Sequence, residues 1–181
     1  MAKAFYPKNP FIKNGVITEL YLKCLRNRWR ILGRLLGQSI GCEIGCIVPS
    51  RLFIPHPNGI VVDTHCRIGN NVVLLQQVTL GVSHPYYDSD VPEWEGDPRV
   101  DDGVFVGAGA KILGHVTVGE WSVIGANAVI TEDVAPDSIV VGSNRVLKKK
   151  ASQLKWLPAT GDLMDTSISQ RLTTLRPGSR L

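Results

Sequence analysis

The sequence predicts an all-β solenoid, a chain wound into stacked coils of short strands, and three observations lead to this fold class. Aliphatic residues recur at every sixth position over residues 62–80 and again over residues 100–130. A small or β-branched residue stands four positions after nearly every one of them, and glycine often follows the aliphatic residue directly. The aliphatic positions are Val62, Ile68, Leu74 and Leu80, then Val100, Val106, Ile112, Val118, Ile124 and Ile130. A period of six fits neither an amphipathic helix nor an ordinary strand. It fits a triangular coil made of three short strands, each coil burying its apolar side chains by stacking on the next coil.

Length and composition agree with one packed domain and exclude several classes of protein. The chain has 181 residues, of which 44% are hydrophobic and 20% charged. No apolar run reaches the roughly 18–20 residues of a membrane span, and the first residues lack the pattern of a secretory signal. Four cysteines are too few for a disulfide scaffold, so we expect a reducing, cytoplasmic location. The net charge is +4, and the basic residues are concentrated at the two ends of the chain. The sequence contains no nucleic-acid-binding motif, so we expect no nucleic acid partner.

The first segment, residues 1–40, is predicted to be basic and helical. Residues 16–37 are expected to form one amphipathic helix with its Lys and Arg side chains around an apolar face. That face would hold Ile17, Leu20, Cys24, Leu25, Trp29, Leu32 and Leu36. Two roles are open for the helix: it caps the first coil, or it contacts an anionic membrane surface as basic amphipathic helices do.

The second segment, residues 41–145, is the predicted solenoid, and residues 146–181 form a basic C-terminal tail. A first, degenerate coil can be phased through Ile44, Ile54 and Ile60. Residues 82–99 interrupt the period with a polar, acidic and aromatic excursion. A long loop inside a compact domain is usually functional, so we expect this loop to take part in the site.

Three stretches carry a family resemblance. They are HPNGIVVDTHCRIGNNVVLLQQVTLG (56–81), DPRVDDGVFVGAGAKILGHVTVGEWSVIGANAVI (97–130) and DVAPDSIVVGSN (133–144). In order and spacing they resemble the serine O-acetyltransferases, which belong to the hexapeptide-repeat acyltransferases. The resemblance implies a left-handed parallel β-helix, an exception to the usual right-handed crossover. It also implies a homotrimer with active sites between subunits, and acetyl-CoA as the acetyl donor.

The resemblance implies a catalytic role for His56. An imidazole can remove the proton of an attacking hydroxyl at neutral pH, and the position of His56 is one where the repeat would otherwise place an aliphatic residue. Glu43 lies thirteen residues earlier, where the family has Asp, and would orient the imidazole and stabilise its charged form. The alternatives are a turn histidine and a surface glutamate.

The resemblance is incomplete where the acceptor would bind. The family's Asp before the catalytic histidine is Pro55 here, and its Arg-His pair in the excursion is Gly96-Asp97. His84 and Asp97 are candidates to contact the acceptor, and Arg99 is the nearest cation for an acceptor carboxylate. A zwitterion needs both of its charges paired, whereas a neutral sugar needs hydrogen bonds and a stacking face. The sequence therefore favours a sugar over free L-serine.

The donor site implied by the resemblance is built from small residues. Gly81, Ala108 and Ala126 would let the pantetheine arm lie along the solenoid, and Lys150 would contact the CoA phosphates. No metal site is expected. We thus expect an acetyl-CoA-dependent O-acetyltransferase whose acceptor is L-serine or a sugar, and the alternative is a non-catalytic binding or assembly module.

Overall fold

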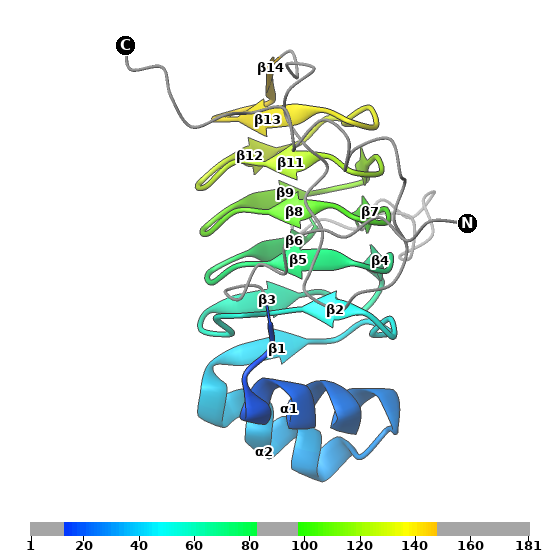
Figure 1. The fold of residues 1–181 in the computed structure, drawn as a ribbon, viewed down its shortest axis with the longest axis vertical. Coiled ribbons are helices and arrows are strands. Elements are labelled where there is room, and N and C mark those ends of the chain that lie inside the picture. Colours follow the sequence, from blue (N-terminus) through cyan, green and yellow to red (C-terminus); the bar gives the residue numbers. More distant parts are fainter. Residues whose placement is uncertain (1–12, 83–97, 148–181) are drawn as a thin grey trace, which may run out of the picture.

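The computed structural model describes residues 13–82 and 98–147, and it shows a stack of β-coils standing on two helices (Figure 1). The helices are α1 (Val16–Arg26) and α2 (Arg30–Ile40). The strands are β1 (Cys42–Ile44), β2 (Leu52–Phe53), β3 (Ile60–Val62), β4 (Arg67–Ile68), β5 (Val72–Leu74), β6 (Thr79–Gly81), β7 (Arg99–Val100), β8 (Phe105–Val106), β9 (Lys111–Leu113), β10 (Thr117–Val118), β11 (Val123–Ile124), β12 (Val129–Ile130), β13 (Ile139–Val141) and β14 (Arg145–Leu147).

The strands form three sheets, which are the three sides of the coil. The first sheet has the order β1-β3-β6-β9-β12, the second β10-β7-β4 and the third β14-β13-β11-β8-β5-β2. Strand pairs are parallel except β13 with β14, which is antiparallel. Along the chain each coil passes from the third sheet to the first and then to the second. The predicted solenoid of parallel coils is confirmed.

The register confirms the six-residue period and its phase. Val62 pairs with Leu80, eighteen residues later, which is one coil of three six-residue steps. The excursion does not shift this phase, because Ile68 pairs with Val100 across it. Nearly all of the predicted aliphatic positions are buried in one continuous core, and Ile68 is half-buried at its edge.

The degenerate first coil is also confirmed. Ile44, Ile54 and Ile60 are all buried in the same core as the later repeats. One polar residue, Ser122, is fully buried at a repeat position. Its hydroxyl donates to the carbonyl oxygen of Ala135 (3.0 Å) and accepts from the amide of Ser138 (3.2 Å), which offsets the cost of burying a polar group.

The prediction of a single helix over residues 16–37 is wrong, because the chain turns between α1 and α2. Arg28 adopts a left-handed conformation (φ 57°), and the amide of Trp29 donates back to the carbonyl of Cys24 (2.9 Å). The predicted apolar face is confirmed only in part, because Cys24 is buried and Leu25 and Leu36 pack against the core, but its other four residues do not. The side chains that α1 buries are Thr18, Tyr21, Leu22 and Cys24, whereas Ile17, Leu20, Trp29 and Leu32 are exposed.

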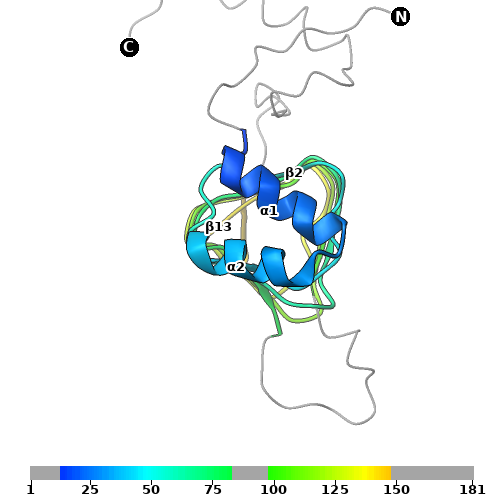
Figure 2. The same cartoon turned by 90° about the horizontal axis from the view of Figure 1, so that it is seen from below.

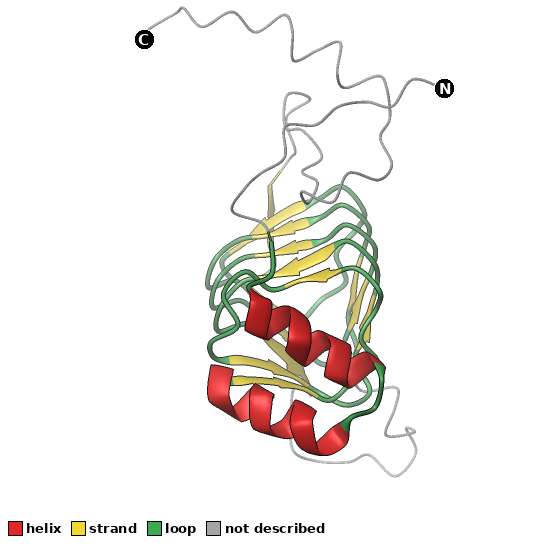
Figure 3. Ribbon diagram, turned by 60° about the horizontal axis from the view of Figure 1, so that its bottom comes forward, coloured by secondary structure: helices red, strands yellow, loops and turns green. Residues whose placement is uncertain are grey.

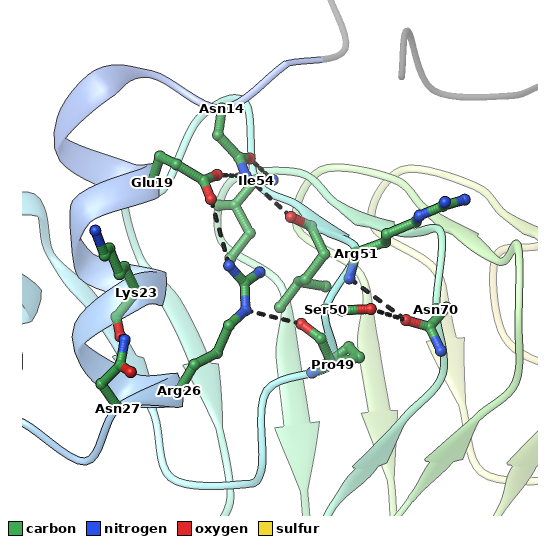
Figure 4. Close-up of polar contacts among 11 residues, drawn as sticks. Asn14, Glu19, Lys23, Arg26, Asn27, Pro49, Ser50, Arg51, Ile54 and Asn70 are labelled. Atoms are coloured by element: carbon green, nitrogen blue, oxygen red, sulfur yellow. Dashed lines mark hydrogen bonds and ion pairs between the residues drawn. The ribbon is translucent and has the colours of Figure 1, made fainter. Parts of the chain in front are cut away.

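The expected capping role of the N-terminal segment is confirmed. The two helices lie side by side across one end of the coil stack (Figures 2 and 3), and Tyr21 and Leu22 belong to the core cluster of the coils. Polar contacts fasten α1 to the first coil (Figure 4). Arg26 donates to the carbonyl of Pro49 (3.1 Å) and pairs with Glu19 (3.3 Å).

Gly37 of α2 marks the closest approach of the helices to the coils. A Cβ there would lie 2.7 Å from the carbonyl oxygen of Cys42 and 3.0 Å from Cε2 of Tyr21. We therefore expect Gly37→Ala to lower the free energy of unfolding by about 1–3 kcal/mol, as overpacking does. At Gly33, in the same helix, a Cβ would lie 3.5 Å from that of Cys24, an ordinary contact.

The matched control is therefore Gly33→Ala. It should leave stability unchanged or raise it by up to about 1 kcal/mol, the helix propensity of alanine over glycine. Urea unfolding followed by circular dichroism measures both variants. Equal changes in the two variants would show that α2 does not pack against β1 as described.

Candidate active site

His56 lies at the corner where the chain passes from the third sheet to the first, and this corner is longer than its counterparts. Phe53 and Val61 are eight positions apart. Their partners one coil further on, Val73 and Thr79, are six apart, and the same spacing holds in the next two coils. The His56 corner thus carries two additional residues.

These additional residues change the explanation for His56. The buried aliphatic residue of the repeat is Ile54, which is fully enclosed. His56 therefore does not replace an aliphatic residue, as the sequence suggested. It stands in the extra length of the corner, between Pro55 and Pro57, with its side chain exposed.

Both ends of the His56 corner are held by hydrogen bonds. The side-chain oxygen of Asn14 accepts from the amide of Ile54 (2.6 Å), and its Nδ2 donates to the carbonyl of Leu52 (2.9 Å) (Figure 4). Asn14 thus covers the open edge of β2 as a neighbouring strand would. At the other end, the amide of Gly59 donates to the carbonyl of Gly41 (2.7 Å). The corner therefore presents His56 from an anchored backbone.

Two of the predicted donor-site residues lie on the same edge of the coil stack as His56. A ladder of backbone hydrogen bonds connects the successive corners: Gln77 N to Asn58 O (2.9 Å), Gly109 N to Gln76 O (2.9 Å) and Asn127 N to Ala108 O (2.8 Å). Ala108 and Ala126 occupy the third and fourth of these corners. The structure thus brings His56, Ala108 and Ala126 onto one edge, with the corner of Gln76 and Gln77 between His56 and the alanines.

Gln76, in the second corner of this edge, was not predicted from the sequence as a site residue. Its side-chain oxygen is buried and has no hydrogen-bond partner among the described residues. Buried polar atoms are nearly always paired in proteins, so this oxygen is available to a donor from a ligand. Continuing the repeat phase from the His56 corner by one coil would have found this residue.

Gly81 and Arg99 lie at the other end of the first sheet, where the chain passes to the second sheet. Gly81 is buried at the end of β6, and Arg99 is exposed on β7. The excursion leaves and rejoins the coils at this corner. The structure therefore separates Gly81 and Arg99 from His56 within one chain.

Arg99 has a second arginine beside it that the sequence analysis also missed. Arg67 of β4 is its register partner on the second sheet, and both side chains are exposed. Like charges directly opposite each other repel, so the pair favours a bound anion. Arg67 and Arg99 directly precede Ile68 and Val100, which are equivalent positions of the repeat. The six-residue pattern therefore already indicated that the two arginines lie side by side.

Glu43 lies on β1 and points outward beside α2. It lines a cavity of about 720 Å³ between α2 and the first sheet, together with Tyr21, Arg34 and Cys42. Burial raises the pKa of the Cys42 thiol to about 12. Burial is also the main cause that raises the pKa of Tyr21 to about 12, and the neighbouring Cys42 raises it further. Both groups therefore stay protonated at neutral pH, and the thiol is unreactive. No hydrogen bond joins Glu43 to His56 in the described parts of the chain, so its orienting role stays a prediction.

Three predicted site residues, His84, Asp97 and Lys150, lie outside the described residues. Within the described ranges no group of three or more His, Cys, Asp or Glu side chains is placed to hold a metal ion. No described helix is long and apolar enough to cross a bilayer.

Comparison with known proteins identifies what this fold resembles. The bacterial transferase hexapeptide model (six repeats) matches residues 97–132. Serine acetyltransferase of Mycobacterium tuberculosis is 40% identical over 96 residues, which cover 53% of this chain and 39% of the relative. The chain is similar to serine acetyltransferases. The resemblance that the sequence suggested is thus confirmed.

Solved structures of serine acetyltransferases agree with this similarity. The Neisseria gonorrhoeae enzyme in complex with serine is 32% identical, with a TM-score of 0.51, and the match covers 68% of this chain and 48% of that one. A serine acetyltransferase in complex with CoA is 29% identical, with a TM-score of 0.51 and coverage of 71% and 53%. The chain thus spans about half the length of the relatives it matches.

Proposed function

We propose that this protein is an acetyl-CoA-dependent O-acetyltransferase. The observation that carries the proposal is His56, exposed on an anchored corner of the edge that also holds Ala108 and Ala126, in a chain similar to serine acetyltransferases. The acceptor hydroxyl attacks the thioester carbonyl carbon while His56 removes its proton. The carbon–sulfur bond then breaks, and CoA leaves as the thiolate, which takes up the proton. The similarity disfavours the alternative of a non-catalytic module.

The donor site in this proposal runs along the edge that His56 shares with Ala108 and Ala126. Small side chains leave room for a pantetheine arm, and backbone amides along the edge would stabilise the thioester oxygen as negative charge develops on it. The unpaired oxygen of Gln76 supports this placement, because it matches the N–H of a pantetheine amide. Lys150 remains our candidate to contact the CoA phosphates. Gly81 remains a candidate to contact the pantetheine arm, at a site shared with a second copy of the chain.

We further propose a left-handed coil and a trimer with shared sites. The His56 corner and the corner of the excursion lie at opposite ends of the first sheet. The points where the excursion leaves and rejoins the coils, Val82 and Pro98, therefore lie away from the His56 corner of the same chain. A neighbouring copy that places its excursion, with His84 and Asp97, beside His56 would complete the site. Glu43 is proposed to support His56 there.

A cytoplasmic location is supported by the cysteines. All four, Cys24, Cys42, Cys46 and Cys66, are buried thiols that are not joined in disulfides. Free thiols are typical of proteins in a reducing compartment, where acetyl-CoA would serve as donor.

Two acceptors are candidates, each favoured by a different observation. The names of the relatives and the gonococcal complex with serine favour L-serine. Pro55, which supplies no carboxylate for an ammonium group, favours a neutral sugar. A buried zwitterion without partners loses the free energy of its hydration, so we keep the sugar as the favoured acceptor.

We therefore expect purified protein to release CoA from acetyl-CoA faster with saccharide acceptors than with L-serine. Thiol release measured with a panel of sugars and amino acids tests the activity and the acceptor together. A kcat/KM for L-serine of about 10⁴ M⁻¹s⁻¹ or more, with sugars inert, would assign L-serine instead. Absence of acceptor-dependent CoA release across the panel would contradict the enzymatic proposal.

Arg99 offers a control that separates the two acceptors. If L-serine binds through its carboxylate, Arg99→Gln should raise the KM for L-serine, because Arg99 and Arg67 supply the exposed cations near the excursion. The same substitution should leave the KM for a neutral sugar unchanged.

A further inference from the structure

The helical end of the molecule exposes an unusual amount of apolar surface. The large hydrophobic side chains that α1, α2 and the turn between them leave exposed are Val16, Ile17, Leu20, Trp29, Ile31, Leu32 and Leu35. Val16 is 87% exposed and Ile31 81%. In each helix the exposed apolar residues follow one another at i, i+1 and i+4, on the side opposite the residues packed against the coils. We call this surface the basal face.

The charge of this end differs from that of the coils. Residues 13–41 contain six Lys or Arg and a single acidic residue, Glu19. Glu19 is paired with Arg26, while Lys23, Arg28, Arg30 and Arg34 are exposed. Residues 98–147, further along the stack, contain three basic and six acidic residues. The described part of the chain is therefore electrostatically polarised along the coil stack, with more positive charge at the basal face than in the upper coils.

We propose that the basal face docks on a bilayer surface that carries anionic lipid. Exposed apolar side chains next to unpaired cations are the combination by which helices lie in the plane of a membrane interface. Because both helices cross the end of the stack (Figure 2), docking would stand the coils upright on the bilayer. The acidic coils of residues 98–147 would then point away from the lipid, so the charge distribution of the described residues favours this orientation.

Charge argues against a second copy of the chain as the occupant. Two basal faces brought together would place two sets of exposed cations opposite each other, and like charges at an interface are unfavourable. An anionic surface pairs with the same cations. A bilayer also accepts apolar side chains spread over two helices, without the shape complementarity that a protein interface needs.

The test is flotation of the full chain with vesicles of phosphatidylcholine alone or mixed with phosphatidylglycerol. We expect binding to the anionic vesicles and release at about 1 M salt, where the Debye length falls to about 3 Å. Arg30→Gln with Arg34→Gln should weaken binding about five-fold for each cation removed. Leu35→Asp should weaken it at least about ten-fold, because an apolar contact with lipid is lost.

Matched controls lie at the opposite end of the stack. Val146 has the same 59% exposure as Leu35, so Val146→Asp controls for the added charge, and Arg145→Gln controls for a lost cation. Both should bind vesicles like the unchanged protein, and thermal melts should show that each variant is folded. Equal binding to neutral and anionic vesicles, or no binding to either, would overturn the proposal. A particle mass that doubles in solution and is halved by Leu35→Asp would assign the face to self-association instead.

Discussion

Replacing His56 with alanine should lower the rate of acetyl transfer by about 10²–10⁴-fold, the usual loss when a general base is removed. The side chain is exposed and makes no hydrogen bond to any described residue, so its removal opens no cavity and breaks no polar network. Its corner is held from both ends through Ile54 and Gly59. The loss should therefore fall on kcat, with the fold unchanged.

The measurement is acceptor-dependent CoA release, with the acceptor that stimulates it most. His115→Ala is the matched control, because His115 is also an exposed histidine but lies at the corner between the first and second sheets. It should keep the full rate. A folded His56→Ala protein with near-normal turnover would remove His56 from the mechanism.

Replacing Ile112 with alanine should lower the free energy of unfolding by about 2–5 kcal/mol. Ile112 is fully buried on β9, an interior strand of the first sheet, and its register partners are Leu80 below and Ile130 above. Each coil of a solenoid contacts only its neighbours. A cavity at this level therefore weakens the contact between the lower and upper coils, and no other part of the chain compensates for it.

Val129→Ala is the control for this prediction. Val129 belongs to the same sheet but points outward and is 36% exposed, so its truncation should cost less than about 0.5 kcal/mol, as surface changes usually do. Urea unfolding measures both variants. Similar losses in the two variants would mean that the first sheet does not bury Ile112 as described.

The coils could be predicted from the sequence because their period is local. One aliphatic side chain in every six residues sets where each strand lies, and the phase persists across the excursion, so that Ile68 and Val100 pair as the repeat predicts. The same phase also contained Gln76 and Arg67. These two were missed because a polar residue on the surface of the coils has no pattern of its own until its neighbours in the stack are known.

The helical end was predicted less well because its signal is ambiguous. The apolar residues of 16–37 fit one continuous helix, and the turn depends on Arg28 in a conformation that side chains rarely adopt. Packing of Gly33 and Gly37 against α1 and β1 determines which faces are buried. That contact is between segments distant in sequence, and a hydrophobic pattern by itself does not select between two apolar faces of a short helix.

By itself the sequence determined the coils and their register, and it offered His56 as a candidate for catalysis. Only the tertiary structure showed that His56 stands in two extra residues of a corner, because that count is made against strands in other coils. Only the structure placed Ala108 and Ala126 on the edge of His56, and Arg99 at the opposite end of the first sheet. The physical reason is that a six-residue repeat sets the order in which the chain follows the three sides of the coil. The distance between two corners depends instead on how the coils stack.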